Sequence, residues 1–142
     1  MLHKLIRFFF TAWLVTLVSP ALAEKPDVAE TIDGTTKVSA EEVIEMLSSK
    51  PDMVIIDARK NSDREKGYIE GSIGLPDTDT TEQSLASHLP GKATPVIFYC
   101  NGVKCGRSVK SAKNAVDWGY TNIYWFRGGW EEWMDKGYPV TK

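Results

Sequence analysis

Three short apolar runs alternate with stretches that have the spacing of helices, and this alternation limits the fold of the chain more than any other feature. The runs lie at Met53–Ile56, Pro95–Tyr99 and Ile123–Phe126 and are rich in β-branched and aromatic residues. Continuous apolar runs of this length are typical of strands that are buried on both faces of a parallel sheet. The alternation therefore predicts a small α/β domain built around a parallel sheet.

Two helices have clear sequence signals. Ser39 and Glu42 form a capping box, with Val38 and Val43 placed as a hydrophobic staple, and they predict a helix over residues 40–49. Small apolar residues at helical spacing predict a second helix over 106–118. The remaining predictions are a short strand at 36–38, a helical turn or loop at 61–66, a glycine-dense segment at 67–76, a short helix at 82–89 and a last helix at 130–136.

The N-terminal residues have the three parts of a secretory signal peptide. Met1–Arg7 is basic, Phe8–Val18 is apolar, and Ser19–Ala23 ends in an Ala-x-Ala pattern. The apolar run is shorter than the roughly 20 residues of a membrane span, although an uncleaved N-terminal anchor is the alternative interpretation. The predicted organisation is a signal peptide at 1–23 with cleavage after Ala23, a flexible lead-in at 24–35 and one domain at 36–142.

Export places restrictions on partners and on cysteine chemistry. We expect a periplasmic or secreted protein without stable membrane association after processing. Cleavage removes two of the 17 lysines and arginines and none of the 19 acidic residues, which leaves an excess of acidic residues. No basic patch stands out either, so we expect no nucleic-acid partner. Disulfides are stable in such a compartment. A bridge between Cys100 and Cys105, however, closes too short a loop to stabilise the fold much, so we expect these residues to have a chemical role.

Cys100 stands where the second apolar run ends, and a glycine-containing loop leads from it into the helix that starts near Arg107. Ligands of α/β sheets bind beyond the carboxyl ends of strands. The loop amides, the helix N-terminus and Arg107 all favour a thiolate at Cys100 and so lower its pKa. We therefore predict Cys100 as the nucleophile; a buried, inert thiol is the alternative. The predicted anion-binding residues are Asn101, Gly102, Val103, Lys104, Cys105, Gly106 and Arg107.

Two further residues with reactive side chains need an interpretation. His88 is the only histidine left after processing and lies in a loop-like region, so a Cys-His catalytic pair lacks support. Cys105 has three possible roles: a bystander, a resolving thiol that forms a disulfide with Cys100, or a metal ligand. No other ligands cluster near it, and we expect neither a metal nor another cofactor.

Four stretches, in order, resemble the single-domain rhodanese family. Val54–Arg59 resembles the strand that ends in Asp-x-Arg, and Val96–Cys100 resembles the strand that delivers the catalytic cysteine. Gly67–Pro76 and Phe126–Val140 resemble the two glycine-containing signatures of the family. The resemblance implies a rhodanese-like α/β fold, with a five-stranded parallel sheet flanked by helices on both faces. We expect the neighbouring aromatic residues mainly to pack in the core.

The resemblance also implies sulfurtransferase chemistry. Cys100 would carry a persulfide and move sulfane sulfur from a thiosulfate- or polysulfide-class donor to a thiophilic acceptor, each a small molecule or carried by a protein. The loop amides and Arg107 would bind the donor and stabilise the persulfide. Asp57 and Arg59 match family positions, and we expect them to form a structural ion pair at the strand end, next to the site.

The loop departs from the family pattern in its length. Sulfurtransferases of the family usually place four residues between the cysteine and the arginine, and the related phosphatases and arsenate reductases place five. Here Asn101–Gly106 gives six, and Cys105 falls where the shorter loop has its arginine. The longer loop implies a larger or differently shaped pocket. A phosphatase or arsenate reductase, and a module in which Cys100 and Cys105 alternate between dithiol and disulfide, are therefore alternative functions.

Overall fold

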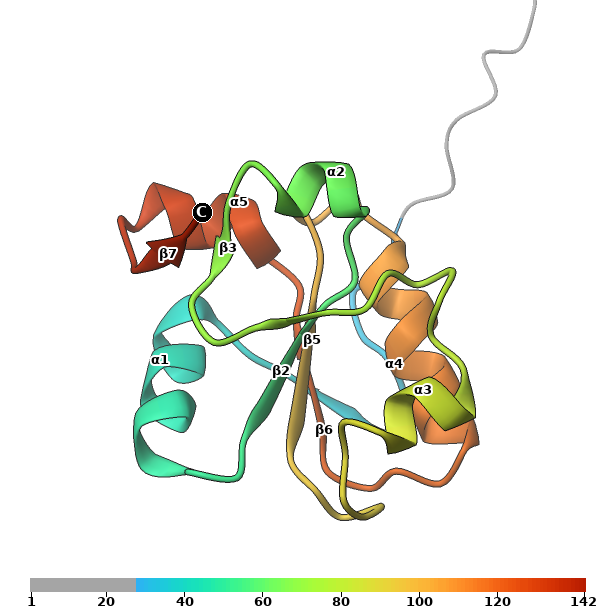
Figure 1. The fold of residues 1–142 in the computed structure, drawn as a ribbon. Helices are drawn as coiled ribbons and strands as arrows, with labels where there is room; N and C mark the ends of the chain where they lie inside the picture. The colour runs from blue at the N-terminus through green and yellow to red at the C-terminus, as the bar shows by residue number, and fades with distance from the viewer. Residues whose placement is uncertain (1–27) are drawn as a thin grey trace, which may run out of the picture.

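The computed structural model describes residues 28–142 (Figure 1). The predicted signal peptide and its cleavage site lie outside these residues. The elements are, in order, β1 (Thr35–Lys37), α1 (Ala40–Ser49), β2 (Val54–Asp57), α2 (Asn61–Arg64), β3 (Tyr68–Ile69), β4 (Ile73–Gly74), α3 (Glu82–Ala86), β5 (Val96–Tyr99), α4 (Arg107–Asp117), β6 (Ile123–Phe126), α5 (Gly129–Asp135) and β7 (Val140–Thr141). None of the helices in this range has both the length and the apolar character needed to span a membrane.

The main sheet has five parallel strands in the order β1-β6-β5-β2-β4, which confirms the predicted α/β fold. β5 lies at its centre, and all four of its residues are buried. Its last residue, Tyr99, is in register with Asp57 of β2 and with Phe126 of β6. The ends of three neighbouring strands therefore lie at the same level, and the residues that follow them share one edge of the sheet.

Helices cover both faces of this sheet, α1 and α5 on one side and α3 and α4 on the other (Figure 1). Side chains along β5 alternate between the two cores, as the period of a strand requires. Ile97 and Tyr99 pack with α1 and α5, whereas Val96 and Phe98 pack with α3 and α4. Most aromatic residues near the Cys100 loop are buried in these cores, as predicted: Tyr99, Trp125, Phe126 and Trp133.

Local signals explain where the helices begin. In α1 the Ser39 hydroxyl accepts from Glu42 N–H at 3.3 Å, and the Glu42 carboxylate accepts from Ser39 N–H at 2.7 Å. The helix has the bounds that this capping box predicts. α3 ends at Ala86, earlier than the predicted 82–89, but Leu85 and Leu89 are both buried in the core.

The glycine-dense segment contains two strands that the sequence pattern did not predict. β4 extends the main sheet beside β2, and β3 pairs with β7 in a small antiparallel sheet. Each of these strands has only two residues, too few to show the alternation by which a strand is recognised.

Candidate functional site

Cys100 lies at the carboxyl end of β5, at the centre of the edge where the three strands end. It is only 2% exposed. Cys105, near the end of the loop, is partly exposed. The nucleophile predicted from the sequence thus occupies the position in which α/β proteins bind ligands, and its more accessible partner is the second cysteine.

The two cysteines form a disulfide, with their Cα atoms 6.1 Å apart. The loop between them turns tightly, since Cys105 N–H donates to Gly102 C=O at 3.0 Å, and α4 follows at once. A disulfide with Cys100 is the product that a resolving thiol at Cys105 would form, and that role stays a prediction.

The start of α5 holds the backbone of the loop. Trp130 N–H donates to Cys100 C=O at 2.8 Å, and Glu131 N–H donates to Asn101 C=O at 2.8 Å. Gly129 permits this approach: its φ is +57°, and a Cβ there would lie 3.0 Å from the Cys100 carbonyl carbon and still closer to its oxygen. A side chain at position 129 is therefore excluded both by backbone conformation and by contact with the nucleophile's own carbonyl.

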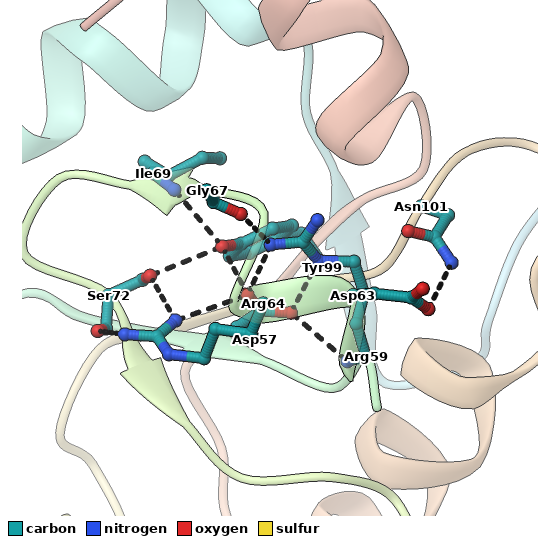
Figure 2. Close-up of polar contacts among 9 residues, drawn as sticks. All are labelled: Asp57, Arg59, Asp63, Arg64, Gly67, Ile69, Ser72, Tyr99 and Asn101. Carbon is teal, nitrogen blue, oxygen red and sulfur yellow. Dashed lines mark hydrogen bonds and ion pairs between the residues drawn. The ribbon is translucent and has the colours of Figure 1, made fainter. Parts of the chain in front are cut away.

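The other predicted loop residues have distinct surroundings. The Asn101 side chain donates to Asp63 of α2 at 3.2 Å (Figure 2). Gly102 is buried against the Glu131 side chain, whereas Val103 and Lys104 are exposed at the tip. The start of the loop is thus anchored to two helices, and its tip is open to solvent.

Arg107 is the predicted cation of the cradle, and its guanidinium forms an ion pair with Asp77. Lys110 approaches the same carboxylate at 3.5 Å. Asp77 therefore neutralises part of the positive charge that the sequence predicts at the start of α4. No sequence pattern indicated this role, because Asp77 lies in an irregular segment far from Arg107 in the chain.

A largely buried polar group, which we call the Asp57 cluster, is centred on the last residues of β2 and β5 and consists of Asp57, Arg59, Arg64, Ser72 and Tyr99 (Figure 2). Arg59 binds both carboxylate oxygens of Asp57, at 2.9 and 2.7 Å. Arg64 reaches Asp57 at 3.1 Å and Ser72 Oγ at 2.8 Å. The Tyr99 hydroxyl donates to Asp57 at 2.8 Å. The predicted strand-end pair of Asp57 and Arg59 is thus the centre of a larger network.

This cluster positions Cys100 by two routes. Tyr99 is the residue directly before Cys100, and its hydroxyl is fixed by Asp57. The Arg59 guanidinium lies over the Trp130 ring, 4.6 Å from its centroid, and Trp130 N–H holds the Cys100 carbonyl. Cation–π contact and hydrogen bonding therefore connect the end of β2 to the nucleophile through α5.

Burial and charge act in opposite directions on the cluster. Burial raises the pKa of Asp57, but hydrogen bonds and charge from Arg59, with the Tyr99 hydroxyl, outweigh it, so the pKa is lowered overall. Burial, followed by the Asp57 charge, raises the pKa of Tyr99. Asp57 is therefore a carboxylate at neutral pH and Tyr99 remains its neutral donor well into the alkaline range.

Replacing Tyr99 with phenylalanine tests this assignment. We expect a loss of about 2 kcal/mol in the free energy of unfolding at pH 7, because a hydrogen bond to a buried charge is removed. The raised pKa of Tyr99 contributes stability that is complete below the unfolded value near 10 and is lost as pH rises above it, by about 1.4 kcal/mol per pH unit. The gap between wild type and variant will therefore narrow above pH 10. Urea unfolding from pH 7 to 11 measures it, and a constant gap would contradict the assignment.

No group of three or more histidine, cysteine or acidic side chains within residues 28–142 is arranged to hold a metal ion. The same range contains no buried side-chain nitrogen or oxygen without a hydrogen-bond partner.

The family model described as Rhodanese-like domain matches residues 39–136, well over half of the chain. The chain therefore belongs to the rhodanese-like family, as its motifs, its parallel sheet and its strand-end cysteine together indicate.

Relatives and solved structures agree with this assignment. A rhodanese domain-containing protein of Drosophila melanogaster is 27% identical over 106 residues, covering 67% of this chain and 94% of the fly protein. The thiosulfate sulfurtransferase/rhodanese-like domain-containing protein 3 of Mus musculus is 30% identical over 109 residues, covering 68% and 67%. The thiosulfate sulfurtransferase of Pseudomonas aeruginosa superimposes with a TM-score of 0.65 at 26% identity, over 75% of this chain and 20% of that one. These similarities support a sulfurtransferase-type fold for the domain.

Proposed function

We propose that this protein is an exported sulfurtransferase that carries sulfane sulfur as a persulfide on Cys100. The observation that supports this most strongly is the position of Cys100, at the end of the central strand of a rhodanese-like domain and held by the start of α5. A cysteine there begins the loop that leads into α4, while its backbone carbonyl is held by Trp130 N–H. The donor is of the thiosulfate or polysulfide class, and donor and acceptor are small molecules or carried by proteins.

The reaction consists of two displacements. In the reduced protein the Cys100 thiolate attacks the sulfane sulfur of the donor, the donor's S–S bond breaks, and sulfite or a shorter polysulfide leaves. An acceptor thiolate then attacks the outer sulfur of the persulfide, and Cys100 is regenerated as a thiolate. Each displacement starts from a thiolate, that of Cys100 in the first step and that of the acceptor in the second, so neither step itself transfers a proton.

The disulfide gives Cys105 a place in this scheme. The Cys105 thiolate can attack the inner sulfur of the Cys100 persulfide, which forms the Cys100–Cys105 bond and expels hydrosulfide. The same disulfide supports a second candidate function, a redox or sulfur-sensing module in which the two residues alternate between dithiol and disulfide. The two functions differ in whether Cys100 holds a sulfur atom from the donor.

Intact-protein mass spectrometry distinguishes them. The protein is reduced, incubated with thiosulfate or polysulfide and analysed as wild type, Cys100→Ser and Cys105→Ser. We expect Cys105→Ser to gain and keep one sulfur atom, the wild type to gain it transiently before the disulfide forms, and Cys100→Ser to gain none. If Cys105→Ser never gains a sulfur, sulfur transfer through Cys100 is wrong, and direct conversion of wild type to the disulfide would favour the redox module.

A further inference from the structure

Arg127 belongs to the Phe126–Val140 stretch and is the residue that directly follows β6. Tyr99 and Phe126 are paired in register, and Cys100 and Arg127 are the residues that follow them on neighbouring parallel strands. Neighbouring strands lie about 5 Å apart. The base of the Arg127 side chain is therefore adjacent to the nucleophile, at the same edge of the sheet.

A carboxylate of the chain itself is already bound to Arg127. The Arg127 guanidinium donates to Glu30 Oε1 at 2.7 Å and to the Ala29 carbonyl at 3.2 Å. Lys37, at the end of β1, approaches the other oxygen of Glu30 at 3.9 Å. The Glu30 side chain is 74% exposed, whereas Arg127 is only 20% exposed. Arg127 is thus held in place by the protein, whereas the exposed side chain of Glu30 can swing away from it into solvent.

A groove connects this cation pair to the loop of the nucleophile. It has a volume of about 360 Å³, and its lining includes Lys37, Arg127, Gly128 and Val103 of the loop. Two acidic residues also line it, and each accepts from a backbone N–H at the start of α1. Glu42 accepts from Ser39 N–H, and Glu132 accepts from Ala40 N–H. Arg127 and Lys37 are the positively charged groups of this lining.

We propose that Arg127 and Lys37 form a carboxylate-binding subsite for the sulfur acceptor, and that Glu30 occupies this subsite until an acceptor arrives. The acceptor class is a thiol that bears a carboxylate. This inference rests on the proposed sulfur transfer. The carboxylate binds the arginine fork, the acceptor thiolate attacks the outer sulfur of the Cys100 persulfide, the S–S bond to Cys100 breaks, and the Cys100 thiolate and the acceptor persulfide are the products.

The test compares two acceptors that differ only in the carboxylate. Full-length Cys105→Ser protein, loaded with one sulfur on Cys100, is mixed with 3-mercaptopropionate or with 3-mercaptopropionamide, and loss of the sulfur is followed by mass. We expect Arg127→Gln to lower the ratio of the two rates about fivefold, and Glu30→Gln to raise it about threefold, which are the effects of one partly exposed arginine–carboxylate contact. Because only ratios are compared, the different intrinsic reactivities of the two thiols cancel.

Matched variants separate a binding contact from a general effect of charge. Arg127→Lys keeps the charge but loses the planar fork, so we expect it to recover less than half of the preference. Lys92→Gln removes another exposed lysine–glutamate pair, that with Glu82, and should leave the ratio unchanged. Full recovery with lysine, or an unchanged ratio in Arg127→Gln, would overturn the subsite.

A second measurement works without any sulfur transfer. The reduced Cys100 thiol is alkylated by iodoacetate, which bears a carboxylate, and by iodoacetamide, which is neutral. The ratio of the two alkylation rates then reports the preference for a carboxylate, as the ratio of the two acceptor rates does. If Cys100 takes up no sulfur but Arg127→Gln lowers this ratio, the proposed function fails and the carboxylate site stands. If the persulfide forms but both ratios are the same with and without Arg127→Gln, the subsite fails and sulfur transfer stands. Absence of alkylation by either reagent also overturns the subsite, since it requires an open path to Cys100.

Discussion

Replacing Arg59 with methionine will lower the free energy of unfolding by about 3–5 kcal/mol, the usual cost of leaving a buried charge without its partner. Asp57 is completely buried, and Arg59 binds both of its carboxylate oxygens. Methionine retains much of the side-chain volume, so the loss reports the missing charge and hydrogen bonds more than a cavity. Urea unfolding at pH 7, with the disulfide intact in both proteins, measures the difference.

Arg64→Met is the matched control. Arg64 also contacts Asp57, but it is partly exposed and leaves the two Arg59 contacts in place when removed. Removal of Arg64 breaks one hydrogen bond to the Asp57 carboxylate and two to Ser72. We expect a smaller loss, about 2 kcal/mol, because Asp57 keeps its two contacts with Arg59. Equal losses for the two variants would contradict a special role for Arg59.

The pH dependence of the Arg59 variant should have the opposite sign to that of the wild type. In the wild type the pKa of Asp57 is lowered, so its stabilising effect is present above the unfolded value near 3.9 and is lost as pH falls through the folded value. Without Arg59, burial dominates and raises the pKa of Asp57, so the variant gains stability as pH falls and the carboxyl group becomes neutral. The stability difference will therefore shrink as pH falls towards the unfolded value near 3.9. A difference that stays constant from pH 7 to 4 would show that Asp57 does not depend on Arg59.

The sequence predicted the central part of the fold because that part depends on local patterns. The β-branched runs became β2, β5 and β6, and the capping box at Ser39 set the start of α1. These signals work because an apolar run and a capping residue have nearly the same effect wherever they occur. The two-residue strands in the glycine-dense segment were missed because tertiary pairing alone defines them.

The sequence predicted only the part of the candidate site that lies in one continuous stretch of the chain. Cys100 and the loop after it follow from one strand–loop–helix stretch. The partners that hold it come from other segments: Asp77 on Arg107, Arg64 in the Asp57 cluster, and Glu30 on Arg127. Each is a charged residue in a polar segment, where most charged residues face solvent, so nothing in the sequence distinguishes these from their neighbours.

The glycine at position 129 is the residue on which the loop and α5 jointly depend, so Gly129→Ala should affect both stability and chemistry. Alanine is strained at a φ of +57°, which costs about 1–2 kcal/mol. Its Cβ would also contact the Cys100 carbonyl, so the hydrogen bond from Trp130 N–H must lengthen or break, at about 1–2 kcal/mol more. A displaced Cys100 should form its persulfide at least tenfold more slowly, since small displacements of reacting atoms have large effects on rate.

Gly137→Ala isolates the contact from the strain. Gly137 has a φ of +67°, close to that of Gly129, but a Cβ there meets nothing within 4 Å. We therefore expect Gly137→Ala to lose only the roughly 1–2 kcal/mol of backbone strain and to take up sulfur at the wild-type rate. The two variants are compared in the Cys105→Ser background. They are incubated with polysulfide, the reaction is stopped at intervals, and the rate of sulfur uptake is measured by mass spectrometry. If both slow persulfide formation equally, backbone strain alone is responsible; if only Gly129→Ala does, the close contact between α5 and the Cys100 carbonyl is what places the sulfur for reaction.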